Sequence, residues 1–174
     1  MFISFMQFIE YLIWSDMDCI NGNNETASTF GPLLTNLQPV ILLLIASMYL
    51  ESSNILPNEI VIVSNIIYLG YVGYKYYYYI QDESNLCIKE NTQKHLDWTW
   101  KKDFNYNYYH LMVLINIINF SSNINLDASI CFTYILLFAS AFNFKENIGE
   151  FWCLLSTSVP LLNLFMQKVL DINN

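Results

Sequence analysis

The chain has 174 residues, of which 55% are hydrophobic and only 13% are charged, whereas soluble domains carry about 25% charged residues. It contains no Arg and has a formal net charge of −8, so no basic surface is available and a nucleic-acid partner is not expected. The four Cys show neither CxxC pairing nor His at zinc spacing, which argues against a metal centre, and no cofactor is expected.

Apolar blocks of helix length recur along the chain and predict membrane spans, because a span needs about 20 mostly apolar residues. The predicted spans cover residues 2–17, 26–50, 59–79, 106–121, 126–144 and 147–169. A soluble core is the alternative, but three of these runs lack the charged face that a surface helix requires. We therefore expect an all-α, polytopic transmembrane helical bundle of about six spans. It would form a single integral membrane domain over residues 1–174, with the lipid bilayer as its partner.

The first apolar run carries three polar or aromatic residues on one helix face. Gln7, Glu10 and Trp14 have i, i+3, i+7 spacing, which stacks them along one side of a helix. A carboxyl inside a membrane is costly, and burial raises its pKa so that it can carry a proton. These residues are candidates for a polar pocket that binds a proton or a small solute. The alternative is a structural hydrogen bond from Glu10 to a neighbouring Asn.

The segment after the first run has two features of a lumenal loop. Asn24-Glu25-Thr26 is a glycosylation sequon, and Cys19 can form a disulfide with Cys87, the alternative being two free thiols. The Lys residues of the loops, however, fall on the same side of the predicted bundle, and the positive-inside rule makes that side cytoplasmic. We favour the cytoplasmic orientation that the Lys residues indicate, and the lumenal alternative stays open.

Amides and a proline interrupt the later spans. Gln38-Pro39 breaks the second span, because Pro39 has no N–H to donate and frees a carbonyl about one turn earlier, near Thr35. Broken helices line binding sites in many transporters, so Gln38 is a further pocket candidate. Asn65 and Asn116 lie within spans, where they can either join the predicted pocket or only link helices through hydrogen bonds.

The long loop at residues 81–105 shows a period of two. Leu96, Trp98 and Trp100 alternate with polar residues after the polar stretch 90–93, and this pattern predicts a short β-hairpin. We expect the hairpin to lie on the bilayer interface, where Trp is enriched. The alternative is an irregular loop with two Trp anchors.

Residues 7–14, Gln-Phe-Ile-Glu-Tyr-Leu-Ile-Trp, resemble the Gln-Gln-x-x-Glu-Gly-x-x-Trp element of an uncharacterised family of small multi-pass membrane proteins. Members of that family occur in bacteria, large DNA viruses and protists. Gln38-Pro39, Glu51 and Trp152-Cys153 resemble further elements of the family. The chain departs from the pattern at Tyr11, where Gly is usual, and it lacks the family's additional helix before this span. The resemblance implies a multi-pass membrane fold and no particular activity.

Two functions follow from the sequence. The leading hypothesis is a multi-pass membrane protein that moves or senses a small solute or ion through a polar pocket around Glu10. The alternative is a structural or assembly protein of a membrane, for example a viral or endomembrane one. Enzymatic activity is less expected, because Glu10 is the lone acid at mid-span in the predicted bundle. A homo-oligomer is compatible with both hypotheses, since six thin spans leave little interior for a pathway.

Overall fold

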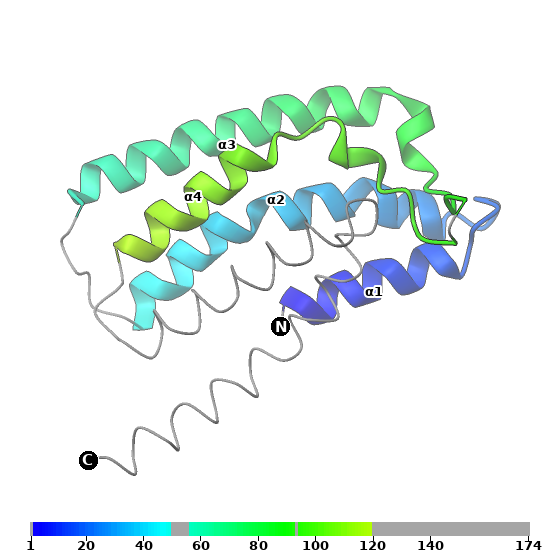
Figure 1. Cartoon of the computed structure of the whole chain (residues 1–174), viewed down its shortest axis with the longest axis horizontal. Helices are drawn as coiled ribbons and strands as arrows, with labels where there is room; N and C mark the ends of the chain where they lie inside the picture. Colours follow the sequence, from blue (N-terminus) through cyan, green and yellow to red (C-terminus); the bar gives the residue numbers. More distant parts are fainter. Residues whose placement is uncertain (1, 50–55, 93, 120–174) are drawn as a thin grey trace, which may run out of the picture. The chain divides into compact units, whose positions relative to one another are not determined.

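The computed structural model describes residues 2–49, 56–92 and 94–119, which belong to one compact unit, Met1–Ser122. Four α-helices and two short 3-10 turns follow one another in this part of the chain (Figure 1). They are α1 Phe2–Trp14, α2 Asn23–Tyr49, α3 Asn58–Gln81, η1 Glu83–Leu86, η2 Thr99–Lys101 and α4 Tyr106–Ile118. We call the turn 15–22 and the segment 82–105 (without residue 93) together the cap, because a disulfide joins them at one end of the bundle.

Local signals account for several of the helix ends. α4 begins where the side chain of Asn105 accepts a hydrogen bond from the N–H of Asn107 (3.0 Å), a standard N-cap. α3 begins after Pro57 and carries Glu59 in its first turn, where the helix dipole favours a negative charge. It ends where the backbone of Asp82 turns extended, and the chain enters the cap there.

α2 is the central helix of the described bundle, since it contacts α1, α3 and α4. It also contains two prolines, Pro32 and Pro39. Neither proline has an N–H, so each leaves the carbonyl four residues earlier without its helical partner. A helix with two such breaks can be buried only if other groups donate to the backbone around them.

α3 places two tyrosine hydroxyls beside these breaks, and one of them lies on a carbonyl that a proline frees. The Tyr79 hydroxyl lies 3.2 Å from the carbonyl of Ser28, which is the group freed by Pro32. The Tyr68 hydroxyl donates to the carbonyl of Asn36 (2.9 Å), beside the second break. Because Ser28 and Asn36 meet these tyrosines in reverse order, α2 and α3 run antiparallel.

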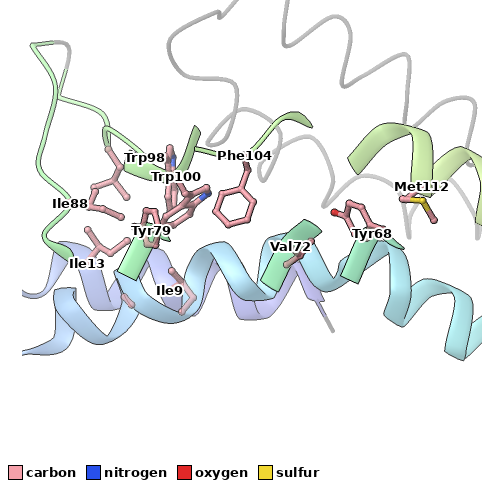
Figure 2. Packing of buried hydrophobic residues seen from close by; sticks show 12 residues of the cluster. Ile9, Ile13, Tyr68, Val72, Tyr79, Ile88, Trp98, Trp100, Phe104 and Met112 are labelled. Atoms are coloured by element: carbon pink, nitrogen blue, oxygen red, sulfur yellow. The ribbon is translucent and has the colours of Figure 1, made fainter. Parts of the chain in front are cut away.

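The core at the cap end is aromatic. Trp98, Trp100 and Phe104 from the cap pack with Tyr79 of α3 (Figure 2), and the two indole rings have centroids 4.6 Å apart. Trp100 also reaches α2 at Gly31, where a Cβ atom would lie 2.6 Å from Cη2 of the indole. The close approach of this ring to the helix backbone therefore requires glycine at position 31.

The prediction of about six membrane spans is wrong. The four predicted runs within the described residues are helices, but α1 and α4 have 13 residues each, well short of the ~20 residues that a span needs. One described stretch, Asn23–Ile45, is long and apolar enough to cross a membrane, a test that the core helix of a soluble protein also passes. The predicted spans 126–144 and 147–169 lie outside the described residues.

The predicted β-hairpin in loop 81–105 is also wrong. The described part of this loop contains no strand, only an isolated bridge between Glu90 and Leu96 and the turns η1 and η2. The alternation of side chains is real, since Leu96, Trp98 and Trp100 are buried and Asp97 is exposed. The alternation arises because the segment packs these side chains against the helices. The two Trp therefore do not act as anchors at a bilayer surface.

Gly31→Ala should destabilise the fold by about 1–3 kcal/mol, the usual cost of overpacking, because the new Cβ would lie 2.6 Å from the Trp100 ring. The matched control is Gly70→Ala on α3, where a Cβ meets nothing within 4 Å. That change is expected to be neutral or to stabilise the helix by up to about 1 kcal/mol. The midpoint of thermal unfolding measures both variants, and equal shifts would contradict the close contact at Gly31.

Candidate functional site

A buried carboxylate holds the turn between α1 and α2. Oδ1 of Asp16 accepts from the N–H groups of Ile20 (2.9 Å) and Asn21 (3.0 Å), and Oδ2 accepts from the N–H of Asn24 (3.2 Å). The N–H of Asn24 lies in the first turn of α2, where the helix dipole also favours a negative charge. The pKa of Asp16 is lowered from its ordinary value, chiefly by the Asn21 N–H, although burial acts in the opposite direction.

The side chain of Asn24 joins α2 to the cap through two hydrogen bonds with the backbone of Ile88. Its Nδ2 donates to the carbonyl of Ile88 (2.8 Å), and its Oδ1 accepts from the N–H of Ile88 (3.0 Å) and from the hydroxyl of Ser28 (2.9 Å). Asn24 is fully buried. The glycosylation predicted at Asn24 is therefore incompatible with this fold, because the nitrogen that would carry the sugar is enclosed and already bonded.

A disulfide reinforces the same junction. It joins Cys19 in the turn 15–22 to Cys87, with Cα atoms 6.0 Å apart and a sequence separation of 68. Closing a loop of this length contributes about 4 kcal/mol in the chain-entropy account. Cys87 directly precedes Ile88, so the disulfide and the Asn24 hydrogen bonds hold neighbouring residues of the cap. Of the two alternatives for these cysteines, the structure contains the paired one.

A second polar cluster lies between α2, α3 and α4. The amides of Asn65 and Asn116 bond reciprocally (2.8 and 3.1 Å), and Nδ2 of Asn116 also donates to the carbonyl of Pro39 (2.7 Å). Both Asn side chains are buried. Oε1 of Gln38 accepts from the hydroxyl of Tyr109 on α4 (2.7 Å). Three of the predicted pocket residues thus link helices through direct hydrogen bonds.

The predicted face of α1 does not point into the bundle. Glu10 is half-buried, while Gln7 and Trp14 are exposed. The buried side of α1 is formed instead by Ile9 and Ile13 (Figure 2). Because Gln7 and Trp14 are exposed, the three residues with i, i+3, i+7 spacing do not together line an internal cavity; only Glu10 turns a carboxyl oxygen inward.

Sequence reasoning missed Asp16 and the two tyrosines of α3 that serve the proline breaks. Tyr79 is the most connected of these, because its hydroxyl also lies 2.9 Å from the carbonyl of Asn85 and 2.8 Å from Oγ1 of Thr99. It therefore ties α2, α3 and the cap together. The available signal was the pair of prolines in one helix, which demands outside donors, but nothing in the sequence says which hydroxyls provide them.

The chemistry open to these clusters is hydrogen bonding between amides, hydroxyls and backbone groups. Among the residues that the structure describes, no three His, Cys, Asp or Glu side chains are grouped so that they could hold a metal ion. An open hollow of about 510 Å³ beside the disulfide is lined by residues of mixed charge. These lining residues are Met17, Asp18, Cys87, Lys89 and Glu90. The hydrogen-bonded clusters described above fix the helices in place.

Comparison of the chain with family models, with curated proteins and with solved structures gives no match. The resemblance of residues 7–14 to a family of membrane proteins therefore stays a prediction. The function is inferred below from the contacts and surfaces of the described residues.

Asp16→Asn should lower the stability of the protein at pH 7, because the charged acceptor at the start of α2 is lost. The carboxyl pKa is depressed in the fold, so its contribution is present above the unfolded value of about 3.9 and is lost as the pH falls through the lower folded value. Thermal unfolding midpoints between pH 7 and pH 2 should thus fall less steeply below pH 4 in the variant. The control Asp18→Asn changes an exposed carboxylate and should keep the wild-type midpoint at pH 7; an unchanged acid profile in Asp16→Asn would contradict this role.

Proposed function

We propose that this chain is an integral membrane protein with a structural or assembly role, and that its described helices do not conduct a solute. The membrane of residence can be a viral membrane or an endomembrane, as the sequence suggested. The observation that carries the proposal is the apolar surface of α3. In the first half of this helix, one face packs against α2 and α4 through Asn65 and Tyr68, and the opposite face is exposed.

The exposed side chains of α3 are almost all aliphatic over its first three turns. They include Ile62, Val63, Ile66 and Ile67, which are 53–67% exposed. In water each such side chain forgoes about 1.5–3 kcal/mol of favourable burial, and patches of this kind mark contact with a membrane or another protein. A lipid environment removes that cost without any further partner.

α2 supports the same conclusion. Its stretch Asn23–Ile45 has the length and hydropathy of a membrane span, yet only 28% of it is buried in the bundle. The core helix of a soluble protein with this composition would be mostly covered. Leu42, Leu44, Ile45 and Met48 near its C-terminal end are all exposed, so this apolar helix presents aliphatic side chains outward.

A structural role is favoured over transport by the way the polar side chains are used. The amides of Asn65 and Asn116 bond each other, Asn116 also bonds α2, and Gln38 bonds α4. Transport needs polar groups that a solute or water can reach and leave. The described polar residues hold helices together, which is the typical use of Asn within membrane bundles.

Ile67→Lys should impair membrane insertion, because a Lys near the centre of a membrane helix costs about 2.5–3.5 kcal/mol on insertion scales. The matched control is Ile20→Lys, which changes an even more exposed Ile in the cap. There the effect should stay within about 0.5 kcal/mol, as for most surface changes. The measurement is the fraction of protein that resists alkaline extraction from membranes. A soluble wild-type protein, or better solubility for Ile67→Lys in plain buffer, would contradict the proposal.

Glu10→Gln separates the structural role from the transport hypothesis. If the role is structural, vesicles reconstituted with the wild type and with the variant should show the same proton permeability as vesicles without protein. Proton flux is followed with an internal pH-sensitive dye after a pH jump. A wild-type flux that the Glu10→Gln change abolishes would establish the pathway around Glu10 and overturn the structural assignment.

A further inference from the structure

The exposed tyrosine and tryptophan side chains gather at one end of the bundle. Every exposed Tyr and Trp whose side chain the structure describes lies within about two helical turns (about 7 residues) of the cap. These residues, which we call the aromatic belt, are Tyr11, Trp14, Tyr74, Tyr77, Tyr78 and Tyr108. They come from three helices, α1, α3 and α4.

Contacts between helices place these rings at a similar level. The ring of Tyr108 at the start of α4 lies 5.0 Å from that of Tyr71 on α3, whose hydroxyl accepts from the N–H of Asn105 (2.7 Å). Tyr71 precedes Tyr74 by less than one turn. Trp14 ends α1, and the disulfide ties the following turn to the segment just after α3. The belt is therefore a zone about 10 Å deep, at about 1.5 Å per residue of α3.

The opposite part of the bundle exposes aliphatic side chains. We call them the aliphatic band; they are Leu42, Leu44, Ile45, Met48, Ile60, Ile62, Val63, Ile66, Ile67, Leu69, Leu111, Leu114 and Ile118. Along α3, the band runs from Ile60 to Leu69, roughly 14 Å at 1.5 Å per residue. This length is about half of the hydrocarbon thickness of a bilayer, about 30 Å.

The charged residues are also distributed unequally between the cap and the aliphatic band. Most of those described lie in the cap, and only Glu10, Glu25, Glu59 and Lys75 lie on helices. Glu25 is in the first turn of α2, next to the cap, and Glu59 is in the first turn of α3, at the far end of the band. Glu10 and Lys75 each lie one residue from a belt tyrosine. Glu10 is thus at the level of the belt, and its Oε1 is buried within the bundle.

We propose that the aromatic belt sits at the headgroup level of a lipid bilayer, with the aliphatic band in the hydrocarbon and the cap projecting into an oxidising compartment. This inference rests on the membrane location proposed above. Tyr and Trp rings favour the headgroup level, because they combine an apolar body with a polar tip. Aliphatic side chains have no such tip, and they occupy the deeper zone.

The disulfide decides which side the cap faces. Cys19 and Cys87 are joined within the cap, and disulfides persist in oxidising compartments but are rare in the reducing cytoplasm. The orientation favoured from the Lys residues is the reverse. In the cap, Lys89, Lys94, Lys101 and Lys102 are interleaved with Asp and Glu. We give the covalent bond more weight, because the Lys rule describes a statistical bias in insertion.

Labelling of single cysteines in sealed membrane vesicles whose outer face is the cytoplasmic one tests this arrangement. Cys131 and Cys153 are replaced by Ala, the native disulfide is kept, and one new cysteine is introduced at Thr92 (cap), Tyr78 (belt) or Ile67 (band). A membrane-impermeant maleimide is added before or after permeabilisation. Thr92→Cys should react only after permeabilisation, and then at least about tenfold faster than Ile67→Cys, because the reactive thiolate does not form in hydrocarbon. Tyr78→Cys should react at an intermediate rate from the same side.

The outcomes separate this inference from the proposed membrane location. Fast labelling at all three positions in a protein without detergent would overturn the membrane location itself. Protection of Ile67→Cys together with labelling of Thr92→Cys before permeabilisation would overturn the orientation alone. Equal protection at Tyr78 and Ile67 would overturn the belt alone.

The wild-type chain gives a second measurement that needs no substitution. Before reduction, a maleimide-linked polymer should leave Cys19 and Cys87 unmodified in protein taken directly from cells, and after reduction it should add to both. Free thiols at these positions in the fresh wild type would overturn the oxidising compartment. Each cysteine variant is accepted as folded only if it retains the same disulfide on a non-reducing gel.

Discussion

The described bundle depends on how the backbone of α2 is satisfied around its two prolines. Pro32 and Pro39 remove N–H groups from the central helix, and an unpaired buried carbonyl is costly in any apolar surrounding. The Tyr79 hydroxyl of α3 lies on the carbonyl that Pro32 frees, and Tyr68 donates to the carbonyl of Asn36 near the second proline. The same contacts fix which face of α3 meets α2 and in which direction it runs. The position of α3 is therefore determined by hydrogen bonding as well as by apolar packing.

The cap is held by three kinds of interaction that converge on one junction. Asp16 bonds the backbone at the start of α2, Asn24 bonds the backbone of Ile88, and a disulfide joins Cys19 to Cys87. Each acts on a different pair of segments, so the loss of one leaves the others in place. A cap secured in this way also brings its aromatic side chains against the helices, where Gly31 makes room for an indole.

Beside its apolar core, the bundle buries several amides and exposes many aliphatic side chains. Amides such as Asn65 and Asn116 are buried and bonded to each other, while aliphatic side chains such as Ile66 and Ile67 face outward. Polar groups inside and aliphatic groups outside are what a hydrocarbon solvent requires. On this view Glu10 needs no special role, since it lies beside Tyr11 at the level where the exposed aromatic rings occur.

The sequence by itself determined where the four described helices lie, because apolar runs of helix length and their breakers are local features. It offered the Cys19–Cys87 disulfide only as one of two alternatives, and the structure decided between them. It could not determine the span count, since α1 and α4 end sooner than their apolar runs suggest. The alternation at Leu96–Trp100 placed three apolar side chains on one face, but the β-hairpin on the bilayer interface predicted from it is wrong, because tertiary packing buries this face against the helices. Tertiary packing also decided which face of α1 enters the core. The buried face carries Ile9 and Ile13 and not the face with Gln7, Glu10 and Trp14. Hydrogen bonds between segments up to 77 residues apart depend on the three-dimensional fold, and no local pattern contains them.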